Sequence, residues 1–179
     1  TMITGPAANG YGTYGANFNI TSDSQRVVYI YQASAGAYPG LNSVPVTGGT
    51  PAGLYGESPL NETMGGRVVS PDGQWVVLTT TPSDRLWAIP TAGGSPVILG
   101  YGFDPQFTPD SSRVLFATDT VSGNWDLMSV QVFGGGQRNL SRVTSSGSVG
   151  AYQISPDGTH VAFVVSYSSD AGSQYEIRL

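Results

Sequence analysis

Four segments of the chain repeat one pattern of apolar and polar positions. Each has a residue or pair of apolar character, a short polar turn that contains aspartate, and then a run of β-branched and aromatic residues. The pattern recurs about every 40 to 50 residues, a period typical of repeat folds. Its turn aspartates are Asp23, Asp72, Asp110 and Asp157. The chain is therefore interpreted as four copies of one structural unit.

The polar turn of each unit predicts a hairpin between two strands. Proline at the second position of a type I turn presets φ, the aspartate side chain bonds nearby backbone amides, and glycine tolerates the exit geometry. The runs that follow are continuously apolar rather than alternating, which is typical of strands covered on both faces. They lie at 26–31, 75–78, 113–117 and 160–165.

Each unit offers further strands, and together they predict an all-β fold. Segments 86–89 and 125–130 indicate a third strand, and a glycine pair or triplet precedes a fourth. Four antiparallel strands in a period of this length form the blade of a β-propeller. The predicted divisions are a leader at 1–14 and blades at 15–58, 59–101, 102–142 and 143–179, the last without its outermost strand.

The turns Ser70-Pro71-Asp72-Gly73 and Ser155-Pro156-Asp157-Gly158, with the apolar strands and glycine pairs, resemble the TolB-type, WD-like β-propeller repeat. The resemblance covers residues 15 to 179. The first repeat departs most, with Ser22 in the proline position and an insertion at 34–40. Propellers of this type have six to eight blades, so the resemblance implies a ring larger than four blades.

The last blade lacks a fourth strand, and residues 3–12 are placed to supply one. Pairing of this segment would cover an exposed sheet edge. We expect an eight-bladed ring made by a homodimer, with a two-fold axis along the channel. The alternatives are a closed four-bladed ring within one chain and a fragment of a larger propeller.

The composition of the chain argues against nucleic acids and membranes as binding partners. Charged residues make up 11% of the chain, the net charge is -5, and all seven basic residues are scattered arginines, which argues against nucleic acid. No apolar run approaches the roughly 20 residues that span a bilayer, so no membrane partner is expected. With no cysteine, disulfides and thiolate metal sites are excluded.

The compartment is left open by the start of the chain. Residues 1–4 resemble the vector-encoded leader of the β-galactosidase alpha peptide. A natural export signal could have been replaced by this leader. The family resemblance then implies a soluble protein that is periplasmic or secreted.

Six acidic residues map to the blade face opposite the aspartate turns. Such a rim attracts cations, and hard oxygen ligands suit a divalent cation such as calcium. Asp104 is the best-placed metal ligand, with Glu57 and Glu62 next. The competing interpretation is that these loops carry solubilising charge only.

Polar residues on the inner strands are candidates for a channel or pocket that takes a small molecule, peptide or protein ligand. They are Asn17, Asn19, Arg67, Gln106, Tyr152 and Gln153. His160 is the only histidine in the sequence. His160 and Asp104 are the two catalytic candidates. The repeats place His160 at a surface strand start, and no Gly-x-Ser-x-Gly elbow accompanies it, which argues against serine hydrolysis.

Three functions therefore stay open. The first is a non-catalytic binding or scaffold platform, as the resemblance implies. The second is a metal-assisted hydrolase of esters or phosphoesters at the acidic channel mouth. The third is a severed part of a larger enzyme, such as the propeller of a prolyl-oligopeptidase-like peptidase.

Overall fold

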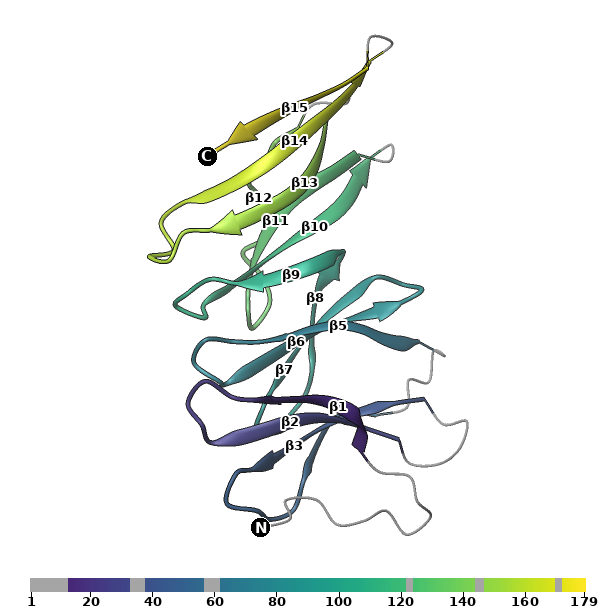
Figure 1. Cartoon of the computed structure of the whole chain (residues 1–179), viewed down its shortest axis with the longest axis vertical. Helices are drawn as coiled ribbons and strands as arrows, with labels where there is room; N and C mark the ends of the chain where they lie inside the picture. Colours follow the sequence, from purple (N-terminus) through teal and green to yellow (C-terminus); the bar gives the residue numbers. More distant parts are fainter. Residues whose placement is uncertain (1–12, 33–37, 57–61, 122–123, 144–146, 170–171) are drawn as a thin grey trace.

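The computed structural model describes residues 13–32, 38–56, 62–121, 124–143, 147–169 and 172–179, and within them it contains strands, turns and no helix (Figure 1). The strands form four antiparallel sheets, which follow one another along the chain. We call these sheets blades 1 to 4. No helix in the described part is long and apolar enough to cross a membrane.

Blades 1 and 2 have four strands each, with neighbours in chain order. Blade 1 contains β1 (Thr13–Ile20), β2 (Arg26–Tyr31), β3 (Gly40–Pro45) and β4 (Ala52–Tyr55). Blade 2 contains β5 (Thr63–Val69), β6 (Trp75–Thr81), β7 (Arg85–Pro90) and β8 (Val97–Tyr101).

Blade 3 repeats this order, and blade 4 shows three strands in the described residues. Blade 3 contains β9 (Phe103–Phe107), β10 (Arg113–Val121), β11 (Asn124–Gln131) and β12 (Arg138–Asn139). Blade 4 contains β13 (Gly147–Ile154), β14 (Val161–Ser169) and β15 (Gly172–Arg178).

The four blades are stacked face to face, with blade 1 at one end and blade 4 at the other (Figure 1). The described residues therefore form an open arc. The alternative of a ring closed within one chain does not match this arrangement, because its first and last blades would have to be neighbours. The strand predicted at residues 3–12 lies outside the described residues.

The hydrophobic core lies between blades. On β6, Val76 and Leu78 pack with Val28 and Leu41 of blade 1, and all four side chains are fully buried. Val77 of the same strand packs on blade 3. A third cluster joins blades 3 and 4. Because both faces of β6 are covered, its sequence is continuously apolar.

The aspartate turns are held by one repeated set of hydrogen bonds. In blade 2, Ser70 Oγ donates to Asp72 Oδ1 (2.5 Å), and the Gln74 amide donates to the same oxygen (3.0 Å). The Trp75 amide donates to Ser70 Oγ at 2.9 Å. Equivalent bonds occur in the other three turns. These carboxylates therefore stabilise their own hairpins.

Neighbouring turns also contact each other. Gly73 has φ of 74°, and a Cβ at this position would meet Asp23 Oδ1 at 2.8 Å. Glycine is therefore required here both for the left-handed backbone and for the close approach of the blade 1 turn. The Asp72 amide donates to Ser111 Oγ of blade 3 at 3.0 Å, which joins a second pair of turns.

We predict that stability falls in acid through the turn carboxylates. Hydrogen bonds from Ser155 and Thr159 lower the pKa of Asp157 to about 2, and bonds from Thr21 and Thr108 lower the pKa of Asp23 and Asp110. Because folding depresses these pKa values, the stabilisation is complete above the ordinary carboxyl pKa and is lost as pH falls toward 2. Thermal unfolding followed by circular dichroism between pH 7 and pH 2 measures this loss.

The triple variant Asp23→Asn, Asp110→Asn, Asp157→Asn is the control for this prediction. It should melt at a lower temperature than wild type at pH 7, and its melting temperature should change less between pH 4 and pH 2. Equal acid slopes for the two proteins would show that other groups control the acid transition.

Candidate functional site

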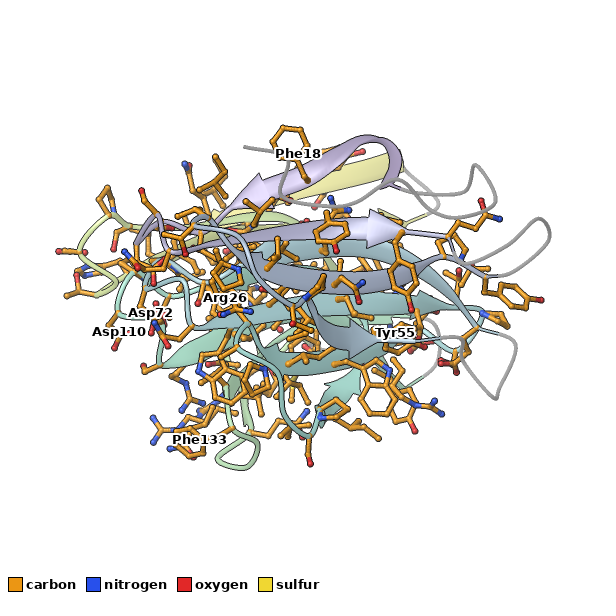
Figure 2. All side chains as sticks on the ribbon, turned by 90° about the horizontal axis from the view of Figure 1, so that it is seen from below. Phe18, Arg26, Tyr55, Asp72, Asp110 and Phe133 are labelled. Atoms are coloured by element: carbon orange, nitrogen blue, oxygen red, sulfur yellow. The ribbon has the colours of Figure 1, made fainter. Side chains whose placement is uncertain are left out.

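The blades present two structurally different faces. Figure 2 places Asp72 and Asp110 at one end of the sheets and Tyr55 at the other. We call the first the turn face and the second the opposite face. The opposite face carries the connections from second to third strands and from one blade to the next.

Side chains on the turn face are engaged in local structure. Arg26 Nε donates to Ser43 Oγ at 2.7 Å, and Arg113 Nε donates to Ser129 Oγ at the same distance. Each arginine therefore ties the start of a second strand to the third strand beside it. These bonds leave the turn face with little free chemistry in the described residues.

His160 lies at the corresponding position of blade 4 and is exposed. Its Nδ1 lies 2.8 Å from Thr159 Oγ1, and its backbone amide donates to Ser155 Oγ at 3.0 Å. Ser155 Oγ in turn donates to Asp157 Oδ1 at 2.5 Å. Serine, aspartate and histidine therefore lie within one turn, but the hydroxyl is bonded to the carboxylate rather than to the imidazole. This is not the order of contacts in a catalytic triad.

The three predicted metal ligands do not come together in the described residues. Asp104 is exposed, with φ of 53°, and its carbonyl oxygen accepts a hydrogen bond from the Tyr152 hydroxyl. Glu62 is 4% exposed and lies in an ion pair. Glu57 lies outside the described residues. Within the described part, no three acidic or histidine side chains are grouped as metal ligands would be.

The partner of Glu62 is Arg85, at the start of β7. Arg85 Nη1 donates to Glu62 Oε1 at 3.0 Å, and the arginine side chain is 17% exposed. Glu62 lies in the connection between blades 1 and 2, and Arg85 is the first residue of β7. Glu62 therefore neutralises a partly buried arginine, a role that its position in the sequence did not reveal.

Aromatic rings surround this ion pair. The Arg85 guanidinium carbon lies 5.7 Å from the centroid of the Trp87 ring and 5.7 Å from that of Tyr101. Tyr55 of blade 1 lies beside Trp87, with ring centroids 6.4 Å apart. We call Tyr55, Glu62, Arg85, Trp87 and Tyr101 the Arg85 cluster.

Three polar atoms of the Arg85 cluster are buried without a hydrogen-bond partner. They are Glu62 Oε2, Arg85 Nε and Trp87 Nε1. Unsatisfied buried polar atoms are costly and are uncommon in folded proteins. One is an acceptor and two are donors. Tyr101 is 54% exposed, so the cluster reaches the surface. These five side chains contain no nucleophile beside a general base.

The predicted channel residues divide into two groups. Gln106 Nε2 donates to the Tyr152 carbonyl oxygen at 3.3 Å, and the Tyr152 hydroxyl lies 3.0 Å from the Leu115 carbonyl oxygen. These two residues therefore join blades 3 and 4. Asn19 and Gln153 are exposed. The side chain of Asn17 lies outside the described residues.

Burial affects the ionisation of two of these residues. It raises the pKa of the Tyr152 phenol, and the nearby Asp104 carboxylate raises it further. Tyr152 therefore stays a protonated donor to backbone oxygens. Burial lowers the pKa of Arg67, whose Nε has no partner.

Comparison with solved structures shows the β-propeller fold. A prolyl endopeptidase superposes with a TM-score of 0.66 at 14% identity, over 93% of this chain and 29% of its own. Oligogalacturonate lyase from Vibrio parahaemolyticus gives a TM-score of 0.62 at 15% identity, covering 93% and 53%. TolB from Acinetobacter baumannii gives 0.54 at 16% identity, covering 93% and 45%. The predicted all-β, TolB-like propeller fold is thereby confirmed.

The likeness is one of fold alone, because the identities are low. No family model and no curated protein matches the sequence. The chain spans less than two thirds of the length of these solved structures. Their activities therefore do not transfer to this chain by comparison.

We predict that Arg85→Met lowers the free energy of unfolding by about 3 kcal/mol, because it leaves the Glu62 carboxylate buried and unpaired. The double variant Arg85→Met, Glu62→Met should recover part of this loss, since it removes the buried charge. Urea denaturation measures both values. Arg138→Met, at an exposed arginine, is the matched control. An equal effect of Arg85→Met and Arg138→Met would show that the ion pair does not stabilise the fold.

Proposed function

We propose that this chain is a propeller module that acts as a binding platform, with its ligand site at the Arg85 cluster. The observation that carries the proposal is the set of three buried, unpartnered polar atoms beside aromatic rings. Pockets that recognise small ligands combine apolar walls with a few placed polar groups in this way. The described residues offer no comparable arrangement on the turn face.

The chemistry of the cluster indicates the kind of ligand. Trp87 Nε1 and Arg85 Nε are donors, and Glu62 Oε2 is an acceptor. A matching ligand offers both acceptors and a donor next to an apolar surface that can lie on a ring. Peptide amides beside a side chain and the hydroxyls of a sugar ring both have this character. Because Glu62 already balances the charge of Arg85, the ligand is neutral.

The second part of the proposal concerns the number of blades in the ring. The apolar faces of a blade require neighbours on both sides, and the open arc supplies none for the outer faces of blades 1 and 4. We propose that a second copy of the chain completes an eight-bladed homodimeric ring. Residues 3–12 of one copy would then form the fourth strand beside β15 of the other copy. In the described sheet, β15 has no outer neighbour.

We predict that the protein binds members of peptide or glycan arrays and that Tyr101→Ala weakens this binding about tenfold, a loss typical of removing one buried aromatic contact. Tyr101 is half exposed, so its truncation should leave the fold intact. Phe133→Ala, which truncates an exposed ring on the turn face, should bind as wild type does. Titration calorimetry on the best array ligand measures the three affinities.

Two results would overturn the platform proposal. One is equal weakening by Tyr101→Ala and Phe133→Ala, which would place the ligand elsewhere. The other is turnover of activated esters or phosphotriesters that is abolished by a chelator and by Asp104→Ala, which would favour the metal-assisted hydrolase at the channel mouth.

A further inference from the structure

One residue of the third strand is exposed in blade 4, whereas its equivalents in the other three blades are buried. In each sheet this residue pairs with the equivalent residue of the second strand. It is Leu41 in blade 1, Leu86 in blade 2, Leu127 in blade 3 and Ile177 in blade 4. The three leucines are fully buried against the following blade, whereas Ile177 is 76% exposed. Ile177 is therefore an interface residue whose neighbouring blade lies outside this chain's own arc.

The face around Ile177 is hollowed. A hollow of about 480 Å³ is lined by residues that include Gln153, Ala162, Val164 and Ile177. A second hollow, of about 260 Å³, shares Gln153 and Ala162 with the first and extends to Leu179. Ala162 and Val164 occupy the positions of Leu115 and Ala117, which are buried in blade 3. The free face of blade 4 therefore carries residues equivalent to those of the internal blade interfaces, and its hollows leave room for a neighbouring blade.

Blade 1 carries the complementary half of the same interface on its outer face. Val27 and Tyr29 occupy the positions of Val76 and Leu78, which pack on the preceding blade in blade 2. Beside them, Ile20 pairs with Val27 and is 59% exposed. The equivalent of Ile20 in blade 3 is buried Phe107. Tyr29 is 5% exposed, so the apolar surface that blade 1 offers to a preceding blade is centred on Ile20.

We infer that a second copy of this chain seats its blade 1 on the free face of blade 4, and that the two chains repeat the internal blade interface at two identical seams. The inference rests on the proposed two-chain ring and names the surfaces that form it. A second copy is favoured because the two free faces are the two halves of one interface that already occurs three times in the chain. Blade 1 of each copy covers the free face of blade 4 of the other copy, and these two contacts close the ring.

Polar groups at the seam fit the same geometry. Within the chain, Gln106 donates to the Tyr152 carbonyl oxygen of the next blade. Gln153 occupies the position of Gln106 in blade 4 and is exposed. Phe18 of the second copy occupies the position of Tyr152. The seam therefore places the Gln153 amide group against the Phe18 carbonyl oxygen.

The turns provide a second equivalence. Ser111 has φ of 61° and accepts a hydrogen bond from the Asp72 amide of the preceding blade. Ser24 occupies the position of Ser111 in blade 1, with φ of 57°, and is exposed. Serine in the left-handed region is less favourable than glycine, and in blade 3 its hydroxyl serves the inter-blade bond. At the seam, the Ser24 hydroxyl would accept from the Asp157 amide.

Light scattering coupled to size exclusion tests this surface. Wild type should have twice the 18.6 kDa mass of one chain. Ile177→Glu and Ile20→Arg should each give monomers, because each places a charge in both apolar seams and raises the dissociation constant about 100-fold or more. Both side chains are exposed in the single chain, so circular dichroism should show unchanged folding. Ile98→Glu, at an exposed position on β8, is the control and should remain a dimer.

Mixing the two monomeric variants provides a sharper test. A heterodimer of Ile177→Glu with Ile20→Arg has one seam with no substitution and one in which both charges, of opposite sign, are present. The mixture should therefore recover the dimer mass, whereas each variant alone should not. Recovery requires that blade 4 of one chain meets blade 1 of the other.

The outcomes separate the surface from the proposals on which it rests. A wild-type monomer would overturn the two-chain ring and the seam together. A wild-type dimer that persists in both variants, or fails to re-form on mixing, would overturn the seam alone. Neither result bears on ligand binding at the Arg85 cluster, which the Tyr101→Ala titration measures.

Discussion

The packing of one blade's apolar face on the next is the interaction on which this structure depends. Val76, Val77 and Leu78 show it within three residues, since the first and third pack on blade 1 and the second packs on blade 3. A β-sheet of this kind has no solvated face. Each blade therefore needs two neighbours, and the stability of the molecule comes from a series of similar contacts rather than from one central core.

This constraint makes the two ends of the sheets different. The turn face must bring successive hairpins close together, and its aspartates, arginines and Ser111 are bonded to backbone or to neighbouring turns. The connections of the opposite face vary more in length, from a single residue between β8 and β9 to the longer segment between β4 and β5. There, Glu62 and Arg85 keep buried polar atoms that are not satisfied within the protein. The unsatisfied polar atoms of the Arg85 cluster therefore lie at the face opposite the aspartate turns.

Local signals in the sequence were enough to predict the strands and turns. Proline, aspartate and glycine at fixed offsets determine a hairpin through contacts within a few residues, as the Ser70 and Asp72 bonds show. The apolar runs after each turn became β2, β6, β10 and β14 because their side chains suit a doubly covered strand.

The candidate site was less predictable because it depends on register and on contacts between connections. A bulge between Val149 and Tyr152 shifts the alternation of β13, so counting by twos does not show that Tyr152 lies against blade 3. The pairing of Glu62 with Arg85 joins the connection before β5 to the first residue of β7. No local rule associates residues that are 23 positions apart in this way.

The recurrence of one buried leucine position at Leu41, Leu86 and Leu127 has an evolutionary consequence. A blade whose two faces match those of its neighbours can be duplicated in the gene without a new kind of surface having to arise. Ring size then changes by whole units of sequence. Selection can change the number of blades by copying a unit, while the connections between strands diverge separately.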